Sequence, residues 1–269
     1  MKLNTSSKEE KNYDEFCDTL LANWKENKIT LEDNYGFDLN ALPEPYLTFG
    51  NGDSKVCFLT NNPGTVADFQ KRNSNFSTDG ESYTNLSKRL AKRYENELQG
   101  GTAGRRIKHM YKSSNMLFSN NNGFTQFEIS PFHSAKFPTK NKFAKDILNA
   151  ENNLHTEYID KLTSILSKKN CISIQGGKPL LERQDQPWLI LVSKILGVKI
   201  EDWKLIVFGY SEKGAATSGV WYHKNNNFFK LITFMDSTTL IPKGFFNTLS
   251  KLEGPVEDIT ELFEILKSS

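Results

Sequence analysis

Short apolar runs that end in polar, glycine-containing turns recur along the chain, and stretches with helical periodicity separate them. The clearest run, 56–60, leads directly into the turn sequence NNPG at 61–64, and further runs lie at 171–174, 203–210 and 228–235. Strands that alternate with helices in this way predict an open sheet covered by helices. We therefore expect an α/β protein, a three-layer α/β/α sandwich with a mostly parallel central sheet.

Periodicity and turn residues predict further elements around these strands. We expect a first helix ending near Asn27, a Pro/Gly-rich connection over 41–54 and a strand over 123–130. Helices are expected over 82–98, 105–117, 157–168, 186–196 and 255–266, with a possible short strand over 219–223.

Length and composition limit the class of protein. The 269 residues suffice for one large domain, and we expect a flexible tail over 1–12 and a single α/β domain over 13–269. No apolar run approaches the roughly 20 residues of a membrane span, and the polar N-terminus lacks an apolar signal region. These features predict a cytoplasmic protein without membrane contact.

The cysteines and histidines give no metal-binding pattern. Cys17, Cys57 and Cys171 lie far apart in apolar or helical contexts, so we expect buried reduced thiols. The four histidines add no ligand spacing. We therefore expect neither a metal nor a cofactor.

Ligands of open α/β sheets bind outside the carboxyl ends of the strands. Three loops are predicted at such ends, over 61–64, 130–134 and 236–246. In the first loop, Gly64 lets a backbone approach a ligand, Pro63 fixes the turn, and Asn62 offers a donor and an acceptor. The same residues also suit an ordinary strand-to-turn connection.

Several short motifs occur in one order along the chain. They are VCFLTNNPG (56–64), NFS (75–77), SYTNL (82–86), FEISPFHS (127–134), ISIQGGKPLL (172–181) and FMDSTTLIPKGFF (234–246). This order resembles the uracil-DNA glycosylase superfamily, and the first motif is closest to its Asn-Pro-Gly branches. The resemblance covers most of the chain and implies that family's α/β fold.

The resemblance implies roles for several residues. Asn62 would hold a water near the sugar, Pro63 and Gly64 would approach the base, and Phe76 would stack on a base flipped out of the helix. Phe76 has a competing role as an ordinary core residue. Ser130 and Phe132 would line the second loop, and Ser237 would hold a DNA phosphate.

The chain departs from the family pattern at two positions. Glu128 stands where the family has an Asn that reads uracil. An ionised carboxylate accepts but does not donate, so it could accept from an exocyclic amino group or a ring N–H of a different base. Alternatively, Glu128 faces solvent on an alternating strand. The final loop has Met235 and Asp236 where the family has a catalytic His, and His133 could fill that role unless it is a surface or packing residue.

Basic residues lie near the predicted loops, although any one of them can also belong to a solvated helix face. Lys136, Lys178 and Lys243 are the predicted nucleic-acid contacts. We expect a monomer that binds single- or double-stranded DNA.

Two functions follow from the resemblance. The first is a DNA glycosylase-like hydrolase of DNA repair, which cleaves the N-glycosidic bond of a flipped uracil-like or other damaged base. The second is a catalytically impaired module that binds nucleic acid or a nucleotide on the same fold. The missing His favours the second, and the Asn62 loop with Phe76 favours the first.

Overall fold

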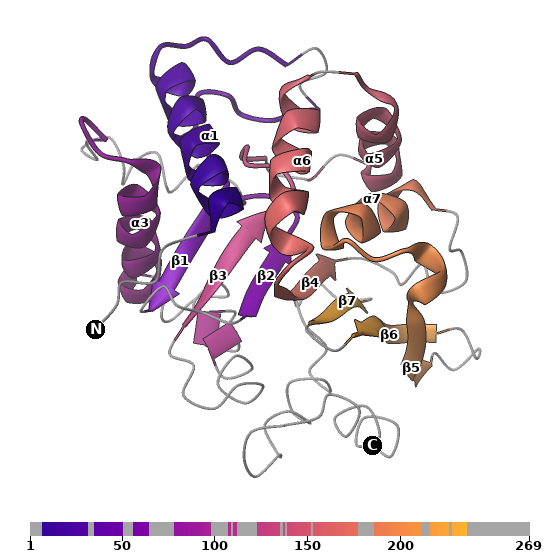
Figure 1. The fold of residues 1–269 in the computed structure, drawn as a ribbon. Helices are drawn as coiled ribbons and strands as arrows, with labels where there is room; N and C mark the ends of the chain where they lie inside the picture. The colour runs from indigo at the N-terminus through magenta and orange to yellow at the C-terminus, as the bar shows by residue number, and fades with distance from the viewer. Residues whose placement is uncertain are drawn as a thin grey trace.

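The chain folds into an α/β protein whose seven-stranded mixed sheet is flanked by helices (Figure 1). The structure, a computed structural model, describes residues 7–31, 35–50, 56–64, 78–97, 107–108, 110–111, 123–134, 137, 139–151, 153–176, 186–210, 216–225 and 228–235. Its elements are α1 (Lys8–Lys25), β1 (Tyr46–Gly50), β2 (Val56–Thr60), α3 (Tyr83–Glu97), β3 (Gly123–Glu128), α5 (Lys140–Asn149), α6 (Leu154–Leu166), β4 (Asn170–Gly176), α7 (Pro187–Leu196), a 3-10 turn (Ile200–Asp202), β5 (Lys204–Tyr210), β6 (Ala216–Lys224) and β7 (Phe229–Met235).

The sheet has the strand order β1-β3-β2-β4-β7-β6-β5, with parallel strands at its centre. β2 pairs in parallel with β3 on one side and β4 on the other, and β4 pairs in parallel with β7. β1 runs antiparallel to β3, and β7, β6 and β5 form an antiparallel meander. The carboxyl ends of β2, β3, β4 and β7 therefore lie at one edge of the sheet.

Local sequence signals explain how the helices begin. At α1, Ser7 Oγ accepts from Glu10 N at 3.2 Å while Glu10 Oε2 accepts from Ser7 N at 2.9 Å, which is a capping box. Asn153 Oδ1 caps α6 through Thr156 N at 2.8 Å. In α1, Tyr13 and Leu20 belong to a buried stripe with helical spacing, so the helix turns one apolar face to the sheet.

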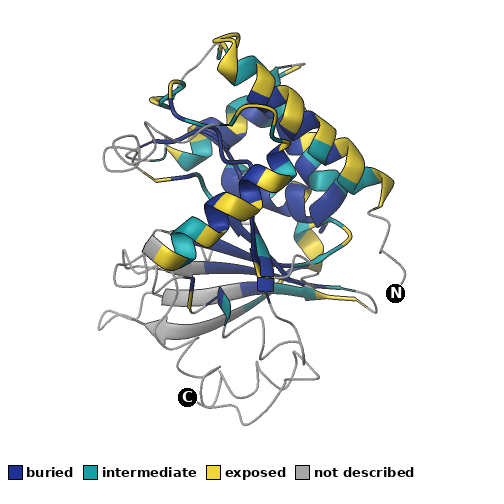
Figure 2. Ribbon diagram, turned by 90° about the vertical axis from the view of Figure 1, so that its left-hand side faces the viewer, coloured by how far each residue is buried: buried dark blue, intermediate teal, exposed yellow. Residues whose placement is uncertain are grey.

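Helices α1, α6 and α7 cover one face of the sheet (Figures 1 and 2). The ring of Tyr13 in α1 lies 5.7 Å from that of Phe127 in β3. Trp188 Nε1 in α7 donates to Gln175 Oε1 in β4 at 3.0 Å. The strand register puts Phe127 and Gln175 on the same face, because Phe127 pairs with Leu59, Leu59 pairs with Ser173, and Gln175 lies two residues after Ser173.

The opposite face of the parallel strands is also buried. Phe58, Phe124, Ile172 and Leu231 on this face are at most 1% exposed. Tyr111 packs against Phe124 edge-on, with ring centroids 5.1 Å apart. Burial on both faces explains why β2 is a continuous apolar run instead of an alternating strand.

Cys17, Cys57 and Cys171 are buried and free of disulfide bonds. Burial raises the pKa of Cys57 to about 11 and that of Cys171 still further, so these thiols stay protonated near neutral pH.

The sheet is less parallel than the sequence predicts, because β1 and the β5–β7 meander add antiparallel pairs. The 41–54 stretch, expected to be a connection, contains β1, and α5 was not predicted at all. Pro45 cannot donate to a ladder, but its carbonyl accepts from Glu128 N at 3.2 Å beside this edge strand.

The N-terminal boundary also differs from the expectation. α1 begins at Lys8, within the stretch expected to be a tail. The expected helix over 105–117 is described only at 107–108 and 110–111, where it is helical. The expected helix over 255–266 lies outside the described residues.

Gly123, the first residue of β3, offers a test of the β1–β3 packing that positions the site strand. Its φ is +148°, and a Cβ there would overlap the carbonyl oxygen of Phe49. We expect Gly123→Ala to lower the free energy of unfolding by about 3 kcal/mol or more, since backbone must move. Gly80→Ala is the control, because Gly80 has φ +65° and open space around its Cβ. It should cost about 1 kcal/mol through strain alone. Equal losses in urea unfolding would contradict the packing described here.

Candidate functional site at the carboxyl ends of β2 and β3

The segments that follow β2 and β3 continue side by side beyond the sheet. Ile129 N donates to Thr60 O at 2.8 Å, and Ser130 N donates to Asn61 O at 2.9 Å. Ser134 N reaches Pro63 O at 3.4 Å. Two of the three predicted loops are thus joined by backbone hydrogen bonds at the sheet edge. The third predicted loop, 236–246, lies outside the described residues, but β7 ends at the same edge.

The side-chain amide of Asn62 holds these two loops together. Its Nδ2 donates to Ser134 Oγ at 3.0 Å and lies 2.6 Å from Pro63 O and 3.4 Å from Phe132 O. These contacts fix the plane of the amide, and Asn62 is only partly buried. Oδ1 is therefore the atom with which Asn62 can accept a hydrogen bond from a water or a ligand.

His133 lies beneath the first loop, paired with Glu44. Its Nδ1 lies 2.9 Å from Gly64 O, and its Nε2 lies 3.5 Å from Glu44 Oε1. His133 is 3% exposed and Glu44 is 2% exposed. Tyr94 OH donates to the Glu44 carboxylate at 3.2 Å. A buried histidine held on both sides positions Gly64, and its imidazole points away from solvent. The catalytic role predicted for His133 stays a prediction.

Opposing effects set the pKa of His133. Burial on its own lowers that pKa. The Glu44 carboxylate, the Gly64 carbonyl and the more distant charge of Glu128 together outweigh burial and raise the pKa above its ordinary 6.5. Once His133 is protonated, the two residues form an imidazolium–carboxylate pair, and the raised pKa extends that state to higher pH.

Glu128 lies inside the protein, in a cluster with Thr60 and Gln126. Glu128 is 3% exposed, so the solvent-facing alternative is wrong. Thr60 Oγ1 donates to Glu128 Oε2, and Gln126 Nε2 donates to Glu128 Oε1 at 2.6 Å. Gln126 Nε2 also lies 3.1 Å from Thr60 Oγ1. Each carboxylate oxygen thus receives a hydrogen bond, which is how a buried carboxylate is stabilised.

Ser130 and Phe132 face the helices. Both are completely buried, and Ser130 Oγ lies 3.3 Å from His155 Nε2. The ring of Phe132 packs edge-on against His155 and tilted against Phe37. Burial lowers the pKa of His155 to about 4, so this imidazole is neutral at physiological pH. The two residues predicted to bind substrate therefore form the support of the second loop.

The remaining predicted site residues, Phe76, Lys136, Lys178, Ser237 and Lys243, lie outside the described residues.

The structure adds site residues that sequence reasoning missed. Thr60, Gln126, Ser134 and Glu44 supply contacts at this edge. Alternation along β3 could have signalled Gln126, because it lies two residues before Glu128 and thus on the same face. No local pattern marks Glu44, which reaches His133 only through the fold.

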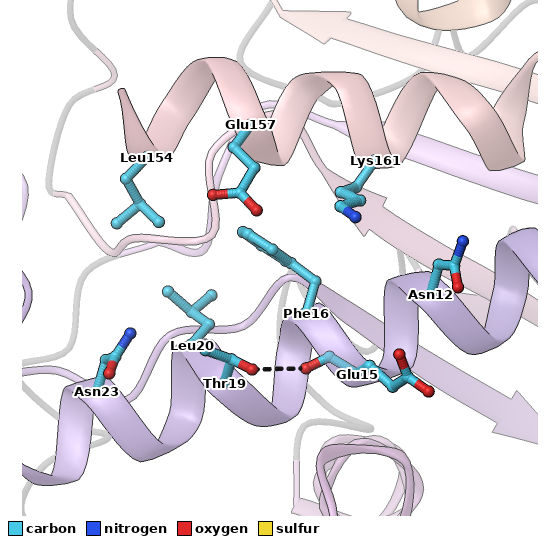
Figure 3. Close-up of a pocket in the computed structure, with 9 residues that line it drawn as sticks. All are labelled: Asn12, Glu15, Phe16, Thr19, Leu20, Asn23, Leu154, Glu157 and Lys161. Atoms are coloured by element: carbon cyan, nitrogen blue, oxygen red, sulfur yellow. Dashed lines mark hydrogen bonds between the residues drawn. The ribbon is translucent and has the colours of Figure 1, made fainter. Parts of the chain in front are cut away.

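A groove of about 360 Å³ lies between α1 and α6 (Figure 3). Phe16 and Leu20 form its apolar floor, and Glu157 and Lys161 lie above them on α6. Tyr158, which packs against Phe16, lies on the sheet side of α6. The groove is therefore on the outer side of the helix layer, and its mixed charges indicate no particular ligand.

No protein-family model, curated protein or solved structure matches this chain. Within the described ranges, no helix combines the length and apolar character needed to cross a bilayer. The same residues contain no group of three or more His, Cys, Asp or Glu side chains that could hold a metal ion.

The His133–Glu44 pair predicts a pH-dependent part of the stability. Because the folded-state pKa of His133 lies above the ordinary 6.5, its contribution is fully present below about pH 6.5 and is lost as pH rises through the folded-state value. We expect wild type to lose more unfolding free energy than His133→Gln between about pH 6 and pH 9 in urea titrations. Identical pH dependences would show that the pair carries no such linkage. His223→Gln is the control, because His223 is a partly buried histidine outside this pair, and it should behave as wild type.

Proposed function

We propose that the chain is a glycosylase-like hydrolase that cleaves the base–sugar bond of a nucleotide in DNA. One observation carries this proposal: the NNPG loop and the end of β3 are joined at the carboxyl edge of parallel strands, the edge where open α/β sheets bind ligands. The order of motifs along the sequence, which resembles the uracil-DNA glycosylase superfamily, agrees with this placement. The proposal includes a three-layer α/β/α arrangement like that of the uracil-DNA glycosylase superfamily.

Asn62 would position the attacking water through Oδ1. An amide is too weak a base to remove a proton, so its contribution would come from placement of the water next to the sugar. The fixed amide plane supports this role, since Nδ2 is already held by Ser134 Oγ and the backbone. In this proposal, Asn62 joins the two loops through Nδ2 and places the water through Oδ1.

A binding module without catalysis is the second candidate. The observation that favours it concerns the histidines: His133 and His155 at this edge are both buried and directed to other protein groups. Neither is presented as an acid for a departing base. Catalysis would then depend on backbone N–H groups to stabilise the negative charge on that base.

Single-turnover assays on single-stranded oligonucleotides test the proposal. The oligonucleotides carry one uracil, hypoxanthine, xanthine or oxidised guanine, and alkali-labile abasic sites are the readout. We expect an abasic product with at least one base. Absence of product with every base, together with DNA binding that weakens with salt, would instead establish the binding module.

Two variants separate the tasks of Asn62. Asn62→Ala removes Oδ1 and should lower the single-turnover rate by about 100-fold or more, as loss of a positioning group does. Ser134→Ala is the matched control, because it removes one acceptor of Nδ2 and leaves Oδ1 in place. It should lower the rate by less than about tenfold. Equal losses would mean that Asn62 acts only by joining the loops.

A further inference from the structure

Thr60, Gln126 and Glu128 form a polar patch at the ends of β2 and β3, on the sheet face that also carries Phe58 and Phe124. Thr60 and Glu128 are register partners at the last positions of β2 and β3, and Gln126 lies two residues earlier on β3. All three are at most 3% exposed. Phe58 is the register partner of Gln126 and is completely buried, so the patch has an apolar neighbour on β2.

The hydrogen bonds within this patch use all of its side-chain donors. Thr60 Oγ1 lies within hydrogen-bond distance of Glu128 Oε2 and of Phe127 O. Both contacts of Gln126 Nε2 are also made inside the patch, to Thr60 and Glu128. Any further partner of this patch must therefore be a donor.

One acceptor in the patch has no partner among the described residues. Gln126 Oε1 is buried and makes no hydrogen bond to any residue that the structure describes. An unpaired buried acceptor costs about 1–3 kcal/mol, and buried polar groups are rarely left unsatisfied. Asn61 Oδ1, immediately beyond Thr60, is a second buried acceptor without a partner in the part of the chain that the structure describes. The ends of β2 and β3 thus carry a surplus of acceptors next to a carboxylate.

We propose that Gln126 and Glu128 make this site selective for a base whose edge carries a ring N–H beside an exocyclic amino group, as guanine-type bases do. This inference rests on the function proposed above. Guanine N1–H and its 2-amino group are adjacent donors, which suit a carboxylate and a carboxamide oxygen. Uracil presents carbonyl oxygens on both sides of its one N–H, and a buried carboxylate repels them.

A hard cation and a buried water are the competing partners for Gln126 Oε1. A cation such as Mg²⁺ or Ca²⁺ takes six or more oxygen ligands, usually with several carboxylates among them. Glu128 is the one carboxylate in this patch. A water would satisfy Gln126 without selecting a base, so it predicts no discrimination between bases.

Guanine and hypoxanthine form the decisive pair, because they differ only in the 2-amino group. We would measure competition binding of the wild-type chain to oligothymidylate that carries one central guanine or one hypoxanthine, in buffer with EDTA. We expect guanine to bind about tenfold or more tightly, the discrimination that one well-placed polar pair provides. Equal affinities, or tighter binding of hypoxanthine or uracil, would overturn the proposal. This comparison requires no variant to fold.

Substitutions in the patch test whether Glu128 and Gln126 cause the difference in affinity between guanine and hypoxanthine. Glu128→Gln and Gln126→Met should each bring the guanine-to-hypoxanthine ratio to within about threefold of one, because each removes an acceptor. Thr233→Val is the control, since Thr233 is a buried hydroxyl on another strand whose bond runs to Ser173 O. It should keep the wild-type ratio. A ratio unchanged in folded Glu128→Gln, judged by its thermal unfolding, would overturn the assignment.

The failures of the two proposals can be told apart. If no base yields an abasic product but guanine still binds more tightly than hypoxanthine, the hydrolase proposal fails and the selectivity stands. If product forms from uracil or hypoxanthine at least as readily as from guanine-type bases, the hydrolase proposal stands and the selectivity fails.

Discussion

The parallel pairing of β2 with β3 and β4 is the constraint on which the candidate site depends. Parallel strands end at one edge, so the residues after Thr60 and after Glu128 must leave the sheet together. The backbone bonds from Ile129 and Ser130 to the β2 end then fix how these segments lie against each other. Because β2 is buried on both faces, a shift of register would move every side chain of the site.

Sequence reasoning predicted this edge because its signals are local. β2 is a continuous apolar run followed by NNPG, and both features can be read within a few residues. β1 was missed because flanking prolines and glycines resemble a connection, whereas an edge strand tolerates them. Glu44 and Gln126 were missed for a different reason. Their importance comes from His133 and Glu128, which approach them only in three dimensions.

Burial of polar groups at this edge costs free energy of folding unless each group finds a hydrogen-bond or ion-pair partner. Most of the polar groups described here have such partners. Glu128 receives bonds from Thr60 and Gln126, and His133 faces both Gly64 and Glu44. Apolar residues of similar size would fill the same space without needing hydrogen-bond partners. These polar groups lie at strand ends, where open α/β sheets bind ligands, and one of them, Gln126, has an acceptor without a partner among the described residues. Both features agree with the recognition proposed above.

The support beneath the loops also limits which chemistry this edge could perform. Asn62 Nδ2, the His133 imidazole and Ser130 Oγ are all directed to protein groups, so each of them helps to hold the two loops in place. In the proposed hydrolase, a site built in this way would act by preorganisation, with a water and backbone dipoles placed before the substrate arrives. Such a site favours substrates whose leaving group needs little help from an acid. In the proposed hydrolase, selectivity would then come from the edge of the base, which the Glu128 patch would contact.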